Sequence, residues 1–157
     1  MATSYTSIDL SRIAHGMELA KCRISSASVH KRKEFVGLIT RDTVVYHLKV
    51  IDSQALCSYM LNWTHDHFSH LDKQFRRIAL ENAAFSQAIS NFPCPRKLIF
   101  NKRDALVVKG MCGQLEYHLV AILKLGVQYA ATSSDIQEAL RDCLQSIIAT
   151  TIQPLQI

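Results

Sequence analysis

Residues 64–92 read THDHFSHLDKQFRRIALENAAFSQAISNF, and apolar residues recur along this stretch at alternating spacings of three and four. This periodicity is typical of a helix with one apolar face. The stripe consists of Phe68, Leu71, Phe75, Ile78, Asn82, Phe85, Ile89 and Phe92, of which Asn82 alone is polar. The pattern predicts one long amphipathic helix near residues 65–91, laid across a sheet. A coiled-coil seam with Asn82 as its polar register position is the alternative.

Three histidines lie near the start of this segment. On a helix, His67 and His70 are neighbours, and so are Asp66 and His70. A tetrahedral zinc site needs further ligands, and no HExxH or C-x-x-C spacing supplies them. Asp66 would instead meet the positive end of the helix dipole. We therefore predict no metal site here, but a helix start followed by a basic ridge that includes Lys73 and Arg77.

Two segments rich in β-branched residues predict strands. Residues 35–51, FVGLITRDTVVYHLKVI, favour a β-hairpin that turns at Arg41 and Asp42. Residues 98–108, LIFNKRDALVV, favour a second hairpin of the same kind. Two hairpins of this length would form a small antiparallel sheet.

The remaining segments predict helices and connections. We expect helices at residues 8–23, 54–63, 114–131 and 132–152, a polar link at 24–34 and a loop from Gly110 to Gly113. Ser134 is the expected cap of the last helix, with Gln137 completing a capping box. The predicted fold class is α+β. A single domain, residues 1–157, would hold two β-hairpins in a small antiparallel sheet packed against several helices.

Composition supports a globular chain in a reducing compartment. Hydrophobic residues make up 48% and charged residues 20% of 157 positions. No continuous apolar run reaches the roughly 18–20 residues of a membrane span, and no signal peptide is evident. Five scattered cysteines without C-x-x-C spacing favour reduced thiols. The expected location is cytoplasmic or nuclear, not secreted.

Positive charge is concentrated in the first two thirds of the chain. Residues 1–110 carry 16 Lys and Arg against 9 Asp and Glu, a net of +7, whereas residues 111–157 carry 2 against 4, a net of −2. A basic region of this kind can face the phosphates of nucleic acid or of a membrane surface. The residues predicted to bind anions are Lys31, Arg32, Lys33, Lys73, Arg77, Arg96, Lys97, Lys102 and Arg103.

Signatures of catalysis are absent from the sequence. No G-x-S-x-G elbow, Walker A loop or dinucleotide fingerprint occurs. Cys57 or Cys112 beside a histidine could form a nucleophile pair, but five cysteines and seven histidines produce such pairs by chance. We therefore predict that the protein is not an enzyme, has no catalytic residues and needs no cofactor.

The helices expected after residue 113 are apolar on most of their surface. Helices of this kind are buried inside a fold or in an oligomer. We predict that self-association uses Leu119, Ile122, Leu144, Ile147 and Ile148.

One long segment resembles a known family. EFVGLITRDTVVYHLKVID, followed by SQALCSYMLNWTHDHFSHLDKQFRRIALENAAF, resembles the C-terminal half of rhabdovirus matrix proteins, and KLIFNKRDALVV resembles their final hairpin. The likeness covers roughly residues 34–109. The matching positions are Phe35, Gly37, Leu38, Thr43, Val45, Asp52, Trp63, Asp66, His67, Phe68, Phe75, Arg76 and Ala79.

This resemblance implies a viral matrix-like structural protein of virion assembly. Such a protein self-associates and binds nucleocapsid or RNA and an anionic membrane surface, in the host cytoplasm or the virion. The chain departs from the family in having no lysine-rich tail and no PPxY motif, since its only prolines are Pro93, Pro95 and Pro154. The alternatives from the residues alone are a small RNA-binding regulatory module, a dimeric adaptor built on the Phe68–Phe92 stripe, and an enzyme using Cys or His near residues 57–70.

Overall fold

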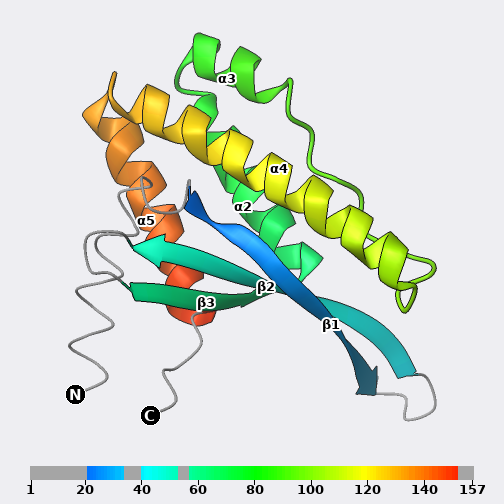
Figure 1. The fold of residues 1–157 in the computed structure, drawn as a ribbon. Helices are drawn as coiled ribbons and strands as arrows, with labels where there is room; N and C mark the ends of the chain where they lie inside the picture. Colours follow the sequence, from blue (N-terminus) through cyan, green and yellow to red (C-terminus); the bar gives the residue numbers. More distant parts are fainter. Residues whose placement is uncertain (1–20, 34–39, 53–56, 152–157) are drawn as a thin grey trace.

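A three-stranded antiparallel sheet forms the base of the molecule (Figure 1). The computed structural model describes residues 21–33, 40–52 and 57–151. The strands are β1 (Arg23–Lys33), β2 (Thr40–Asp52) and β3 (Cys57–Trp63), paired in the order β1-β2-β3. They make two hairpins that share β2, so the predicted antiparallel sheet of two hairpins is confirmed.

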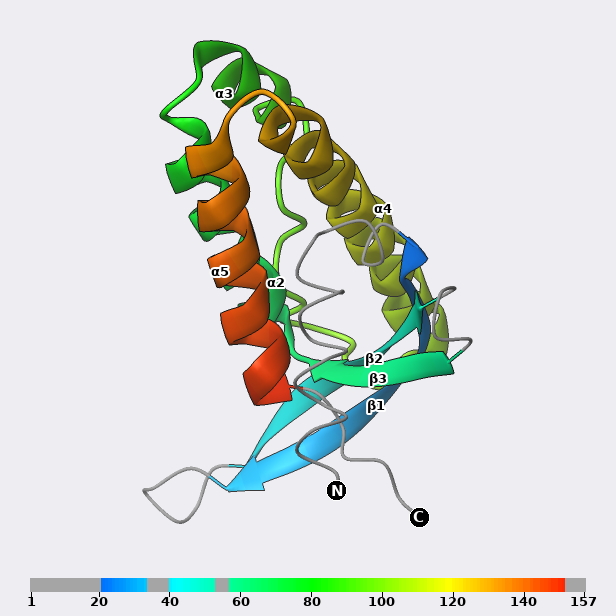
Figure 2. The ribbon, with the colours of Figure 1, turned by 90° about the vertical axis from the view of Figure 1, so that its left-hand side faces the viewer.

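Four described helices follow the sheet in sequence. They are α2 (His65–Ala79), α3 (Ala83–Ile89), α4 (Ala105–Ala130) and α5 (Ser134–Thr151). Figure 2 shows them gathered on one face of the sheet. The predicted fold class, an α+β single domain, is therefore confirmed.

The core forms where alternate residues of the sheet meet the helices. Val44, Tyr46, Leu48 and Val50 of β2 are buried, as the two-residue period of a strand requires. Trp63 at the end of β3 is buried and packs edge-on against Phe68 of α2 with ring centroids 5.0 Å apart. Its indole Nε1 donates to Thr151 Oγ1 over 2.8 Å, which fastens the end of α5 to the sheet.

The positions of the predicted strands need correction. Arg41 and Asp42 lie inside β2 and pair with β1, so the turn predicted there is wrong. The polar link expected at 24–34 is largely β1, and the helix expected at 54–63 is wrong because residues 57–63 form β3. Tyr59, Leu61 and Trp63 alternate into the core, the period of a strand.

The long helix expected near 65–91 is two helices. α2 ends at Ala79, and Asn82 adopts an extended backbone with φ −142° and ψ 114°. Its side chain accepts a hydrogen bond from Phe85 N at 3.1 Å and so caps α3. Phe85 and Ile89 remain buried, so the apolar stripe continues although the helix does not.

The second predicted hairpin, at 98–108, is also wrong. The described residues 92–104 contain no strand, and α4 begins at Ala105. Asp104 caps this helix by accepting from Leu106 N at 2.9 Å and Val107 N at 3.3 Å. The loop expected from Gly110 to Gly113 lies within α4.

Within the described ranges, α4 is the one helix long and apolar enough to cross a membrane, by length and composition only. Core helices meet the same test, and α4 buries Leu115, Leu119, Ile122 and Leu123 in the fold. At Gly126 an added Cβ would lie 3.1 Å from the ring of Phe75, so α4 and α2 approach closely there. We therefore assign α4 to the core.

The C-terminal helix forms close to its prediction. Ser133 precedes α5, and its Oγ accepts from Ile136 N at 3.4 Å, so the cap lies one residue before the predicted Ser134. The five residues predicted for self-association are buried within a single chain, which corrects their assignment from an interface to the core. They are Leu119, Ile122, Leu144, Ile147 and Ile148. The helix predicted at 8–23 lies outside the described residues except for its last three positions.

Candidate functional site

Large apolar side chains are exposed in the segment that leads into α4. We refer to residues 97–106 as the tip. Ile99 is 72%, Phe100 78% and Leu106 81% exposed. Exposed apolar residues are unremarkable when scattered singly, but a cluster of large ones marks a surface that meets another apolar phase. Three within eight residues make the tip the leading candidate for a functional surface.

The segment that leads to the tip is held along α2. Pro93 and Pro95 cannot continue α3, because proline lacks the backbone N–H that a helix requires. Arg76 of α2 donates from Nη1 to Ile89 O at 3.3 Å and from Nη2 to Phe92 O at 2.6 Å. His65 donates from Nε2 to Pro95 O at 2.6 Å. The chain is therefore fixed at several points before it reaches Lys97.

The far side of the tip is fastened to β2. Lys102 Nζ donates to Asp42 O at 2.9 Å, and Arg103 binds both carboxylate oxygens of Asp42, at 2.9 and 3.0 Å. The hydrogen bonds from Arg103 hold the pKa of Asp42 below its usual value. Asn101 takes a left-handed backbone with φ 58°, a conformation that asparagine tolerates better than most residues. Ile99 and Phe100 are thus presented on an anchored loop.

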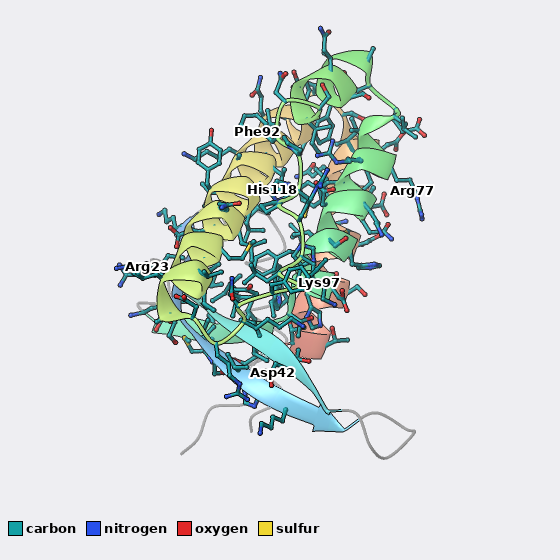
Figure 3. All side chains as sticks on the ribbon, turned by 90° about the vertical axis from the view of Figure 1, so that its right-hand side faces the viewer. Arg23, Asp42, Arg77, Phe92, Lys97 and His118 are labelled. Atoms are coloured by element: carbon teal, nitrogen blue, oxygen red, sulfur yellow. The ribbon has the colours of Figure 1, made fainter. Side chains whose placement is uncertain are left out.

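Basic residues from distant parts of the sequence gather at this end of the molecule. Lys31 of β1 is the strand partner of Asp42, so Lys31 lies beside the tip. Lys97 lies within 3.5 Å of the Asp66 carboxylate at the start of α2. Figure 3 shows Lys97 and Asp42 at the same end of the fold. The structure therefore brings together four of the nine predicted anion-binding residues: Lys31, Lys97, Lys102 and Arg103. The side chains of Arg32 and Lys33 lie outside the part of the chain that the structure describes.

Three further predicted positions, Arg96, Lys73 and Arg77, lie elsewhere or at the margin. Arg96 is exposed directly before the tip. Lys73 and Arg77 are exposed on α2, and Figure 3 shows Arg77 well away from Lys97 along that helix. At 1.5 Å per residue, Lys73 is about 10 Å further along the axis than Asp66. The basic ridge predicted on α2 is therefore a separate surface.

A cavity of about 400 Å³ opens beside the tip, between β2 and the start of α2. Its lining includes Lys97 and Lys102, but also Asp42 and Asp66, and the imidazole of His65. The two carboxylates offset the two ammonium groups. The excess positive charge is therefore on the outer surface, around the exposed apolar residues, and not inside the cavity.

Sequence reasoning identified the cations of this surface but missed its apolar part. Ile99 and Phe100 were expected in a strand of the second hairpin. The signals that could have placed them in a loop are Asp104, a favourable helix cap, and the two prolines that precede them.

Two of three comparisons with known proteins found no match. No protein-family model matches the chain, and no curated protein matches it. Among solved structures, the chain is similar to the mouse SNX19 PX domain crystallised with a bound sulphate ion. The two share 19% sequence identity with a TM-score of 0.44, over 76% of this chain and 93% of that chain.

These findings correct the family resemblance drawn from the sequence. The solved structure is a PX domain, not a rhabdovirus matrix protein. The final hairpin that carried part of the resemblance, KLIFNKRDALVV, forms the tip and the start of α4. The interpretation as a matrix protein of virion assembly is therefore wrong, and the RNA-binding and adaptor alternatives gain no support. The function proposed below rests on this chain's own surface.

Proposed function

We propose that the protein binds peripherally to anionic membrane surfaces through the tip and the basic residues around it. The observation that carries this proposal is the exposure of Ile99 and Phe100 between Lys97 on one side and Lys102 and Arg103 on the other. Apolar side chains at the boundary of headgroups and acyl chains gain free energy by burial, and flanking cations gain by attraction to anionic lipids.

The two contributions differ in size and in range. Each Lys or Arg near an anionic leaflet contributes about 1 kcal/mol, screened by salt, whereas burial of a large apolar side chain contributes about 1.5–3 kcal/mol. Asp42, Asp66 and Asp104 lie among the cations and reduce the net attraction. Binding by charge alone would therefore be weak, and the apolar residues are needed to hold the protein at the surface.

With membrane attachment of this kind, we expect the protein in the cytoplasm, at the face of a membrane. The expected location in a virion or in the cytoplasm of a host rested on the resemblance to matrix proteins and is withdrawn with it. Self-association stays a prediction without an assigned surface, because the residues proposed for it are core residues.

We expect no enzymatic activity. Burial raises the pKa of the Cys22 thiol to about 12 and of the Cys143 thiol to about 11, and it also raises the pKa of Cys94 and Cys112. A raised pKa disfavours, at these four cysteines, the thiolate that nucleophilic catalysis requires. The side chain of Cys57 lies outside the part of the chain that the structure describes.

Flotation with vesicles tests the proposal. The protein should float with vesicles of phosphatidylcholine containing about a third phosphatidylserine and remain at the bottom of the gradient with phosphatidylcholine alone. Binding should weaken, without vanishing, as salt rises from about 50 to 500 mM, because screening removes the charge contribution and leaves the apolar one. Absence of binding to both vesicles, or equal binding to both, would contradict the proposal.

A further inference from the structure

A second cluster of side chains lies where α2, α4 and the segment before the tip meet. Asp72 comes from α2, Cys94 from the segment between α3 and α4, and His118 from α4. Each offers a ligand atom, and these atoms all lie within 4.8 Å of one another. Figure 3 shows His118 between α4 and α2. The fold thus brings together a carboxylate, a thiol and an imidazole from residues up to 46 positions apart in the sequence.

The carboxylate of this cluster is buried and hydrogen-bonded on both oxygens. Asp72 Oδ1 lies 3.0 Å from His118 Nε2, and Arg76 Nε donates to Asp72 Oδ2 at 2.9 Å. Arg76 therefore orients the carboxylate through its outer oxygen, and Oδ1 faces the imidazole.

The imidazole of His118 has a nitrogen with no partner. The ring is 3% exposed, and its Nδ1 is buried without a hydrogen bond among the described residues. Buried polar atoms are nearly always satisfied, so an exception needs an explanation. The nitrogen that faces Asp72 is Nε2, so Nδ1 lies on the other side of the ring and does not point to the cluster. The ion pair of Asp72 with Arg76 accounts for the carboxylate, but it does not account for Cys94 at the same point.

We propose that Asp72, Cys94 and His118 bind a zinc ion. Carboxylate oxygen, cysteine sulfur and histidine nitrogen are the donors that Zn²⁺ uses, at about 2.0–2.3 Å from the metal. Tetrahedral coordination at these lengths needs the donors closer together than 4.8 Å, so the three side chains approach one another when the metal binds. A water molecule would be the fourth ligand, because Cys94 is only half-buried.

Charge and protons balance at this site. Zn²⁺ replaces the thiol proton of Cys94, which leaves to solvent. His118 binds through Nε2, the nitrogen that faces Asp72, and its ring proton moves from Nε2 to Nδ1, so the imidazole remains neutral. The two charges of the metal meet the carboxylate and the thiolate, while Arg76 keeps its bond to the outer oxygen of Asp72. Sulfur and nitrogen donors favour zinc over magnesium and calcium, which prefer oxygen.

Cobalt titration tests the site, because Co²⁺ takes the same donors and absorbs light. The protein is first stripped with a chelator and kept reduced. Addition of one equivalent of Co²⁺ should produce a thiolate-to-cobalt charge-transfer band together with the visible bands of tetrahedral cobalt, and Zn²⁺ should then remove both. Absence of the charge-transfer band in the unaltered protein would overturn the proposal.

Matched cysteine variants identify the thiol. Cys94→Ser should abolish the charge-transfer band and weaken cobalt binding more than about tenfold, since even loss of an outer partner of a metal ligand costs about 10–100-fold. Cys112→Ser and Cys143→Ser are controls on α4 and α5 and should bind as the unaltered protein does. A band that survives in Cys94→Ser, or that is lost in a control, would refute the assignment.

Alkylation of the unaltered protein gives a test that needs no variant. Zinc should slow the labelling of Cys94 by iodoacetamide, followed by mass spectrometry, and leave the rate at Cys112 unchanged. Equal rates at Cys94 with and without zinc would count against the site. The zinc site does not depend on membrane binding, and either proposal can fail alone.

Discussion

Replacement of Phe100 by alanine should weaken membrane binding by an amount that the structure sets. The side chain is 78% exposed, so nearly all of its surface is available for burial in the headgroup region. Full burial of a side chain of this size contributes about 1.5–3 kcal/mol, and alanine keeps only the first carbon. We therefore expect a loss of about 1.5–2 kcal/mol, which corresponds to roughly 10–30-fold in the partition coefficient.

Leu80→Ala is the matched control for this variant. Leu80 is 74% exposed but follows the end of α2, away from the tip. Both variants would be titrated with vesicles rich in phosphatidylserine, and partition coefficients derived from cosedimentation at several lipid concentrations. Thermal unfolding should be unchanged in both, since neither side chain is packed. Equal affinity of Phe100→Ala and Leu80→Ala would refute the role of the tip.

Three further perturbations test the charge around the tip and the packing of the helices. Charge reversal across residues 31–33 should weaken binding to anionic vesicles and flatten its salt dependence, because each cation contributes about 1 kcal/mol near the surface; unchanged cosedimentation across a salt series would remove this hairpin from the site. Gly113→Ala should raise the free energy of unfolding in urea by about 0.5–1 kcal/mol, because alanine favours the helix more than glycine and its Cβ would meet no other atom. Gly126→Ala should lower the free energy of unfolding by about 1 kcal/mol, because the new Cβ would meet the ring of Phe75. The opposite ranking would contradict the packing of α4 on α2. Asp72→Asn should lower the free energy of unfolding by about 3 kcal/mol at neutral pH. Because the pKa of this carboxyl is lowered in the folded protein, its stabilising contribution is present above about pH 4 and is lost as the pH falls through the folded pKa. The urea midpoints of the variant and the unaltered protein should therefore converge in acid.

Several elements could be predicted from local pattern alone. The alternation of Val44, Tyr46, Leu48 and Val50 identifies β2, and the helical period of Phe68, Leu71 and Phe75 identifies α2, because each pattern extends over the whole element. The break at Asn82 could not be inferred from the apolar stripe, because α3 continues the same stripe after a cap. The short apolar stretch of β3 fits either period, and only pairing with β2 decides it.

The candidate site likewise contains residues that could be predicted from the sequence and residues that could not. Charged residues such as Lys97 and Lys102 are visible in the sequence as surface residues, whereas Ile99 and Phe100 read as core residues. Their exposure follows from anchors distant in sequence, Arg103 on Asp42 and His65 on Pro95, which hold the loop open. The zinc donors are equally scattered: Asp72 and His118 lie 46 positions apart, and no motif links them.

The fastening of the tip has a consequence for how quickly the protein can engage a surface. A loop that must order itself on contact gives up about 1–2 kcal/mol per residue in backbone entropy. Here Arg76, His65 and the Arg103–Asp42 pair fix the loop beforehand, so the encounter complex already has its final shape. Preorganisation of this kind favours capture on the first productive collision, at a rate set by diffusion and long-range attraction rather than by a folding step.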